Sequence, residues 1–194
     1  MKITCLLGSP RTKGNSAAIA RHFLDTAKEL GAQVQKYTLN TMEFRGCQAC
    51  LSCKMKLDHC AVKDDLTQVL EDIRSSDILV LATPTYFHEV SSQMKAFIDR
   101  TYSYFVPDFI TNPVPSRLSG EKQLVFIQTQ GQPDPAMFAD IFPRYGGIFQ
   151  RLGFSKQHLI RGCGLRDLND ISKQENIFKK AEDLARQLVM PAIS

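Results

Sequence analysis

The chain has 194 residues, of which 43% are hydrophobic and 23% charged, and its formal net charge is +4. This length and balance fit one folded domain and exclude a disordered chain. The basic residues are spread along the chain rather than gathered into a patch, so we expect no nucleic-acid partner. Because no apolar run reaches the ~20 residues of a membrane span and the first residues lack a signal-peptide pattern, we expect a cytoplasmic protein with no membrane partner.

The first half of the chain alternates between strand-like and helix-like patterns. Residues 3–7 form a short apolar run, which is typical of a buried strand. Residues 16–30 place their apolar side chains on one helical face, and residues 34–39 predict a second strand. After a cysteine-rich segment, Asp64 and Asp65 can cap another helix, whose apolar residues recur at helical spacing and form one face.

The second half continues the alternation. Residues 78–82 are apolar throughout, as a central parallel strand covered on both faces should be. The remaining strands are expected at residues 124–128 and 158–160, and the remaining helices are expected to begin at Ser91 or Ser92, at Asp134-Pro135 and after a capping box at residues 172–175.

Five strands alternating with five helices predict an α/β protein with a parallel sheet covered by helices on both faces. We expect one domain over residues 1–194, with a cysteine-rich insertion at about residues 45–62. The Pro-rich segment at residues 106–120 can serve a subunit contact, cover a ligand or form a peripheral loop.

The loop between the first strand and the first helix, residues 8–16, is a candidate phosphate site. It contains hydroxyl and amide side chains together with the cations Arg11 and Lys13. Parallel sheets bind ligands at the carboxyl ends of their strands, and a helix N-terminus favours anions. The loop matches neither the dinucleotide nor the Walker pattern, and the alternative is an ordinary turn with solvated cations.

Two motifs carry a family resemblance. Gly8-Ser9-Pro10-Arg11 with Gly14-Asn15-Ser16 resembles the phosphate loop of the NADPH-dependent FMN reductase-like flavoproteins. Pro84-Thr85-Tyr86-Phe87, with the run at residues 92–100, resembles their second flavin loop and the helix after it. The resemblance covers nearly the whole chain and implies a flavodoxin-like, doubly wound, five-stranded parallel sheet that binds FMN.

The resemblance also implies a set of FMN contacts. The phosphate would lie on the first loop, whose candidate residues are Ser9, Arg11, Lys13, Asn15 and Ser16. The isoalloxazine would lie against the second loop, whose candidates are Pro84, Thr85, Tyr86, Phe87 and His88. Tyr86 and Phe87 suit stacking on a flat ring, with ordinary loop packing as the alternative. A third loop could border the flavin edge through Thr129, Gln130 and Gly131, although such loops occur in many α/β proteins.

Four cysteines, Cys47, Cys50, Cys53 and Cys60, follow the pattern C-x₂-C-x₂-C-x₆-C. A thiolate run with this spacing can wrap three corners of an iron–sulfur cubane while a later cysteine closes the fourth. Structural zinc more often takes pairs separated by a longer loop. Gly46 is expected to let the backbone turn tightly before the run. Zinc binding, a redox-switchable disulfide and free thiols are the alternatives.

The compact motif is similar to that of the iron–sulfur flavoproteins, a subgroup of the same family. This resemblance implies a [4Fe–4S] cluster on the four cysteines, and a homodimer or homotetramer in which flavin and cluster communicate across subunits. Cys5 and Cys163 fall in or near expected strands, where we expect them to be buried apolar residues.

The leading hypothesis is an FMN-dependent oxidoreductase that transfers electrons between FMN and a [4Fe–4S] cluster, with a redox protein or NAD(P)H as its partner. One alternative is an NAD(P)H-dependent FMN or quinone reductase without a cluster. A flavin-free binding or scaffold module is the alternative from another class, and it would take up no FMN.

Overall fold

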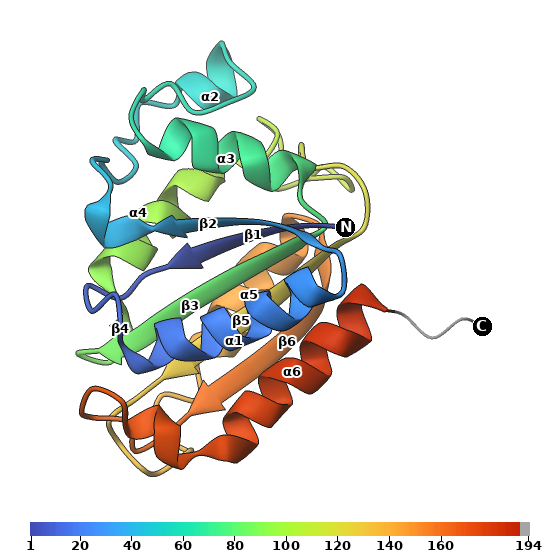
Figure 1. The fold of residues 1–194 in the computed structure, drawn as a ribbon. Helices are drawn as coiled ribbons and strands as arrows, with labels where there is room; N and C mark the ends of the chain where they lie inside the picture. The colour runs from blue at the N-terminus through green and yellow to red at the C-terminus, as the bar shows by residue number, and fades with distance from the viewer. Residues whose placement is uncertain (191–194) are drawn as a thin grey trace.

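The computed structural model describes residues 1–190, so the last four residues of the expected domain lie outside the described residues. Its central sheet has the strand order β2-β1-β3-β5-β6, with every neighbouring pair parallel (Figure 1). These strands are β1 (Lys2–Leu7), β2 (Gln33–Thr38), β3 (Ile78–Tyr86), β5 (Lys122–Thr129) and β6 (Phe154–Gly162). The two-residue strand β4 (Glu89–Val90) pairs antiparallel with the end of β3. This order is that of a flavodoxin-like sheet, which confirms the expected fold class.

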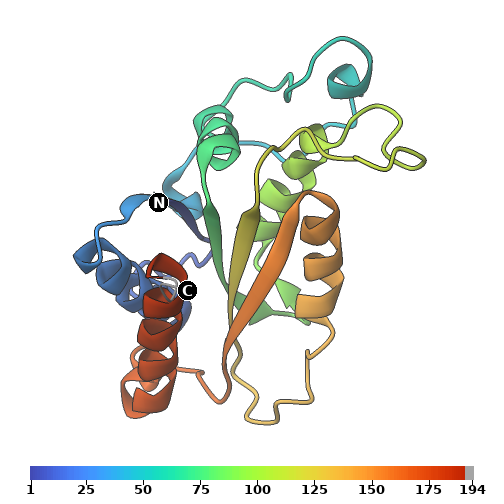
Figure 2. The ribbon, with the colours of Figure 1, turned by 90° about the vertical axis from the view of Figure 1, so that its right-hand side faces the viewer.

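Helices cover both faces of the sheet (Figure 2). One face carries α1 (Asn15–Glu29) and α6 (Glu175–Val189), and the other carries α3 (Leu66–Ser75), α4 (Ser92–Arg100) and α5 (Ile141–Arg151). The short helix α2 (Ser52–Met55) lies in the cysteine segment, away from the sheet (Figure 1). The described residues also contain three 3₁₀ helices, η1 (Leu39–Thr41), η2 (Thr101–Tyr104) and η3 (Asp170–Lys173). Among residues 1–190, no helix combines the length and the apolar character needed to cross a membrane.

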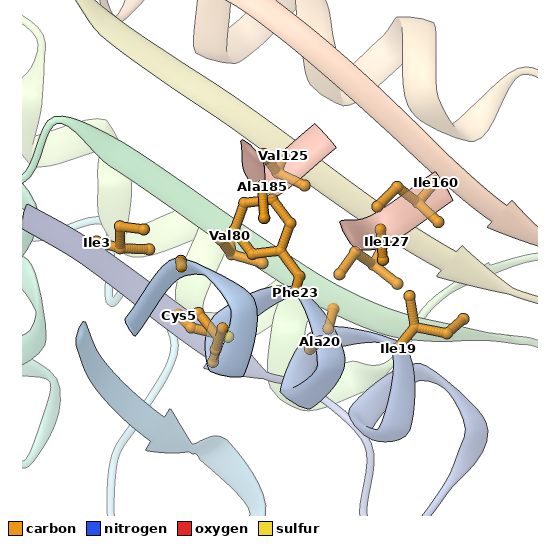
Figure 3. Packing of buried hydrophobic residues seen from close by; sticks show 14 of the residues in the cluster. Ile3, Cys5, Ile19, Ala20, Phe23, Val80, Val125, Ile127, Ile160 and Ala185 are labelled. Atoms are coloured by element: carbon orange, nitrogen blue, oxygen red, sulfur yellow. The ribbon is translucent and has the colours of Figure 1, made fainter. Parts of the chain in front are cut away.

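Strand β3 shows why the central strands are apolar throughout. Val80 and Ala82 pack into the cluster under α1 and α6, whereas Leu79 and Leu81 pack into the cluster on the opposite face. Successive side chains of a strand point to opposite faces, so a strand covered on both sides needs apolar residues at every position. Figure 3 shows the first of these clusters, with Phe23 of α1 directed at the sheet.

The helix expected to begin at Asp134-Pro135 begins instead at Ile141, and this prediction was wrong. Residues 135–140 form turns, because the side chains of Gln130, which directly follows β5, and of Arg161, in β6, bind backbone carbonyls there. Gln130 donates to the Asp134 carbonyl, and Arg161 donates to the carbonyls of Pro135 and Met137. These carbonyls accept side-chain hydrogen bonds in place of the i→i−4 backbone bonds of a helix.

The capping box expected at residues 172–175 is absent from the described structure. Ser172 lies in η3, where its hydroxyl donates to the Asn169 carbonyl, and α6 begins at Glu175 with Gln174 at its N-cap and no side-chain cap. The prediction failed because a local 3₁₀ turn takes the hydroxyl. Of the two remaining cysteines, Cys5 is fully buried as expected, whereas Cys163 is only half-buried.

Candidate functional site

Four loops at the carboxyl edge of the sheet enclose a cavity of about 210 Å³. The loops follow β1, β3, β5 and β6, and β1 and β3 are the strands between which the strand order reverses. All the residues expected to bind FMN line this cavity, apart from Lys13, Phe87 and His88. The lining residues are Ser9, Arg11, Gly14, Asn15, Ser16, Pro84, Thr85, Tyr86, Thr129, Gln130, Gly131, Leu165, Arg166 and Leu168.

The first loop brings the start of α1 to the cavity. Gly14 is the N-cap of α1, and within residues 1–190 no side chain caps this helix. The N–H groups of a first helical turn have no intrahelical acceptor, so this end of α1 offers backbone donors at the cavity wall. The loop is tightly folded around Gly14, because a Cβ atom there would lie 3.0 Å from the Arg11 carbonyl oxygen and 3.3 Å from Ser9 Oγ.

The Asn15 side chain has a different set of partners from the phosphate contact expected for it. Its Nδ2 donates to the Asp167 carbonyl at 2.9 Å, and its Oδ1 accepts from the Ile171 N–H at 3.2 Å. Asn15 therefore ties the first loop to the loop after β6. The remaining polar groups of the first loop at the cavity are the two hydroxyls, Ser9 and Ser16, and the exposed guanidinium of Arg11.

The second loop divides its aromatic residues between the cavity and solvent. Tyr86 lines the cavity, whereas the Phe87 side chain is fully exposed. His88 packs edge-on against Phe138, with ring centroids 4.9 Å apart. Both Phe87 and His88 have left-handed backbone conformations, with φ of 45° and 69°, which are uncommon for bulky residues. This turn directs the two side chains away from the cavity that Tyr86 lines.

Sequence reasoning missed the loop after β6. Leu165, Arg166 and Leu168 line the cavity, and the Asp170 carboxylate holds their loop by accepting from the N–H groups of Arg166 and Asp167. The hydrogen bond from the Asp167 N–H, followed by the one from the Lys173 side chain, lowers the pKa of Asp170. The signal for this loop was its position, since it follows a strand whose carboxyl end lies at the same edge of the sheet.

The four clustered cysteines line a second cavity, of about 310 Å³. Arg100 and Tyr102, at the C-terminal end of α4 and in η2, form part of the same wall. Ala49 and Leu51, on either side of Cys50, have left-handed conformations with φ of 50° and 56°. The tight turns that bring the run to one cavity therefore fall at these residues rather than at Gly46, and non-glycine residues in this conformation are strained.

The thiols in this cavity differ in their surroundings. Cys47 and Cys50 are exposed, Cys53 is buried and Cys60 is half-buried. Hydrogen bonds from the backbone and side chain of Ser52 lower the pKa of Cys50, whereas burial raises the pKa of Cys53. Within residues 1–190, no three or more His, Cys, Asp or Glu side chains are gathered closely enough to hold a metal ion. The thiols thus share one cavity wall without being drawn together into a coordination group.

Comparison with known proteins gives a family and a fold. The family model described as NADPH-dependent FMN reductase matches residues 1–137. A protein of Archaeoglobus fulgidus named iron-sulfur flavoprotein is 34% identical over 104 residues, which cover 54% of this chain and 47% of that protein. The chain spans about half the length of the curated relatives of this name that it matches.

Two further likenesses extend over nearly the whole chain. The Bacillus subtilis protein YwqN, named as an NAD(P)H-dependent FMN-containing oxidoreductase, is 25% identical over 193 residues, covering 94% of this chain and 99% of that protein. The crystal structure of an FMN-dependent NADH-azoreductase from Bacillus anthracis aligns with a TM-score of 0.77 at 19% identity, covering 97% and 100% of the two chains. At that identity the structural likeness concerns the fold.

Proposed function

This chain belongs to the NADPH-dependent FMN reductase family, and on that premise we propose that it is an FMN-dependent oxidoreductase whose clustered cysteines hold a [4Fe–4S] cluster. The observation that carries the cluster proposal is that Cys47, Cys50, Cys53 and Cys60 line one cavity of about 310 Å³. Four thiolates are the usual ligand set of a [4Fe–4S] cluster. The likeness to proteins named iron-sulfur flavoprotein supports the same proposal.

The cavity at the sheet edge is the proposed FMN site. The uncapped first turn of α1 supplies backbone donors, and Arg11 supplies a positive charge, which together suit a phosphate. The hydroxyls of Ser9 and Ser16 would add hydrogen bonds, and Tyr86, which lines the same cavity, offers an aromatic face. When bound, a flavin supplies hydride and one-electron exchange, and a cluster carries single electrons.

Helix α4 connects the two proposed sites. Its N-cap residue, Ser91, donates from its hydroxyl to the Gly8 carbonyl at 2.6 Å, and so fixes the helix to the first loop. Its last residue, Arg100, lines the cysteine cavity. A helix of nine residues is about 13 Å long, so this single element sets how the two cavities are spaced within one chain. We further propose that the protein forms a homodimer or homotetramer and that its electron partner is NAD(P)H or a redox protein.

A second candidate is an NAD(P)H-dependent FMN or quinone reductase in which the cysteines hold no cluster. The observation that favours it is the likeness to YwqN, which extends over 94% of this chain, whereas the proteins named iron-sulfur flavoprotein align over about half. The two candidates differ in iron content, because only the first requires a cluster.

The test is a visible spectrum with iron and acid-labile sulfide analysis on protein purified without oxygen. The proposal predicts flavin bands and about four irons per chain. Cys53→Ser should lose the iron and keep the flavin, and the control Cys163→Ser should keep both, since Cys163 lies outside the cysteine cavity. Flavin without iron after anaerobic reconstitution would reject the cluster and leave the second candidate. Failure to take up FMN would reject both and favour a scaffold module.

A further inference from the structure

Arg100 is a buried arginine that uses all its donors. Its side chain is 0% exposed, and a guanidinium in such a place is costly unless it is paired and hydrogen-bonded. Nη1 and Nη2 donate to the two carboxylate oxygens of Asp64 at 2.7 and 3.2 Å. Nη1 also donates to the Arg45 carbonyl at 2.8 Å, and Nη2 to the Val62 carbonyl at 2.9 Å. The fifth donor, Nε, lies 3.0 Å from Cys60 Sγ.

These partners stand at the two ends of the cysteine segment. Arg45 lies two residues before Cys47, and Val62 and Asp64 follow Cys60. The Asp64 carboxylate closes the same junction from the other side, because it accepts from the Arg45 N–H at 3.1 Å. One guanidinium at the end of α4 therefore fastens the entry and the exit of the segment that carries all four thiols.

The hydrogen bond to sulfur is not needed to neutralise the guanidinium, since the Asp64 carboxylate supplies the counter-charge and the two carbonyls accept the other Nη hydrogen bonds. A neutral thiol is a weak acceptor, whereas a thiolate that ligates a metal is a strong one. Hydrogen bonds to the ligating sulfurs are among the factors that set the reduction potential of an iron–sulfur cluster. The Nε–H group is therefore placed where it would act on a cluster held by Cys60.

We propose that Arg100 is a positioning residue of the cysteine cavity. Its guanidinium holds the two ends of the segment at residues 45–64 together, and it donates a hydrogen bond to the Cys60 sulfur when that sulfur is a cluster ligand. This inference rests on the proposed cluster. The hydrogen bond stabilises the added negative charge of the reduced cluster, so its loss shifts the midpoint potential to more negative values.

The test compares Arg100→Lys and Arg100→Gln with the wild type as the anaerobically prepared holoprotein. Arg117→Lys is the matched control, because the Arg117 guanidinium donates to the carbonyl oxygens of Ser103 and Cys53 rather than to a sulfur. Iron and sulfide per chain, FMN content and the midpoint potential from an EPR-monitored titration are measured. Both Arg100 variants should lose at least half of the iron, or keep it at a more negative potential, with FMN content unchanged. The control Arg117→Lys should have the iron, sulfide and FMN content and the midpoint potential of the wild type.

A measurement on the wild type keeps the inference testable if the variants fold poorly. Protein labelled with ¹⁵N-arginine should show a weak ¹⁵N hyperfine coupling in pulsed EPR of the reduced cluster, and Arg117→Lys should retain it. Absence of this coupling in iron-loaded wild type, or an Arg100→Lys protein with unchanged iron and potential, would overturn the role of Arg100 alone. Wild-type protein that takes up no iron would overturn the cluster proposal as well.

Discussion

Replacing Asp64 by Asn should destabilise the protein more than an ordinary change of one charge. The carboxylate accepts hydrogen bonds from Arg100 and from the backbone N–H groups of Arg45 and Leu66. Burial by itself would raise the pKa of Asp64, but the hydrogen bond from Arg100 and those from the backbone outweigh it and lower the pKa. An Asn side chain has one oxygen and no charge, so the Asp64→Asn protein leaves the guanidinium buried without its counter-ion.

The size of the effect follows from burial. The side chains of Arg100 and Asp64 are 0% and 11% exposed, so solvent screens their attraction little. Breaking a buried pair by removing one partner costs about 3–5 kcal/mol. Since 1 kcal/mol shifts the melting temperature of a domain of this size by about 2–4 °C, we expect a decrease on the order of 10 °C.

Urea unfolding followed by circular dichroism measures this loss, on proteins matched for FMN and iron content. Asp183→Asn is the control, because Asp183 pairs with Lys179 on the surface, where both side chains are mostly exposed, and such pairs contribute about 0.5 kcal/mol or less. A loss for Asp64→Asn no larger than that of the control would refute the reasoning.

The same variant has a pH signature. The pKa of Asp64 is lower in the folded protein than in the unfolded chain, so its stabilisation is fully present above the unfolded value of about 3.9. It is lost as the pH falls through the lower folded value. The difference in unfolding free energy between wild type and Asp64→Asn should therefore shrink below about pH 4, and a difference that stays constant there would contradict the assignment.

Three further predictions follow from the fold and the proposed FMN site. Gly14→Ala should weaken FMN binding about tenfold in a fluorescence titration, because its Cβ would lie 3.0 Å from the Arg11 carbonyl oxygen and the loop must shift at a cost of about 1–2 kcal/mol. The control Gly147→Ala, whose Cβ would meet nothing within 4 Å, should leave the affinity unchanged, and equal affinities of the two variants for FMN would contradict the prediction. Arg11→Gln should weaken FMN binding by about 1.5–3 kcal/mol and reduce its dependence on salt, and an unaltered salt dependence would argue against a phosphate contact. Phe23→Ala should lower the free energy of unfolding by about 3–5 kcal/mol, because Phe23 is fully buried, whereas the fully exposed Phe87→Ala should change it by less than about 0.5 kcal/mol in the same urea assay.

The sequence determined the elements whose pattern is local. The unbroken apolar run at residues 78–82 predicted a buried strand, and the helical spacing of apolar residues predicted the buried face of α1. Both patterns lie within a short stretch of sequence, and both elements are present as expected. The first loop could be placed at a ligand site because a parallel strand followed by a helix fixes where that loop lies. The spacing of the four cysteines likewise singled them out, because a short segment keeps its own residues close together.

Only the tertiary structure decided what depends on distant partners. The Asn15 amide is hydrogen-bonded to residues that follow β6, Arg161 of β6 binds the carbonyls just before α5, and Arg100 reaches Cys60 across 40 residues of chain. No local pattern encodes these contacts, because they arise from the strand order and from which helices share a face of the sheet. A side chain's hydrogen-bonding capacity is visible in the sequence, whereas its partner is set by the packing that brings the two together.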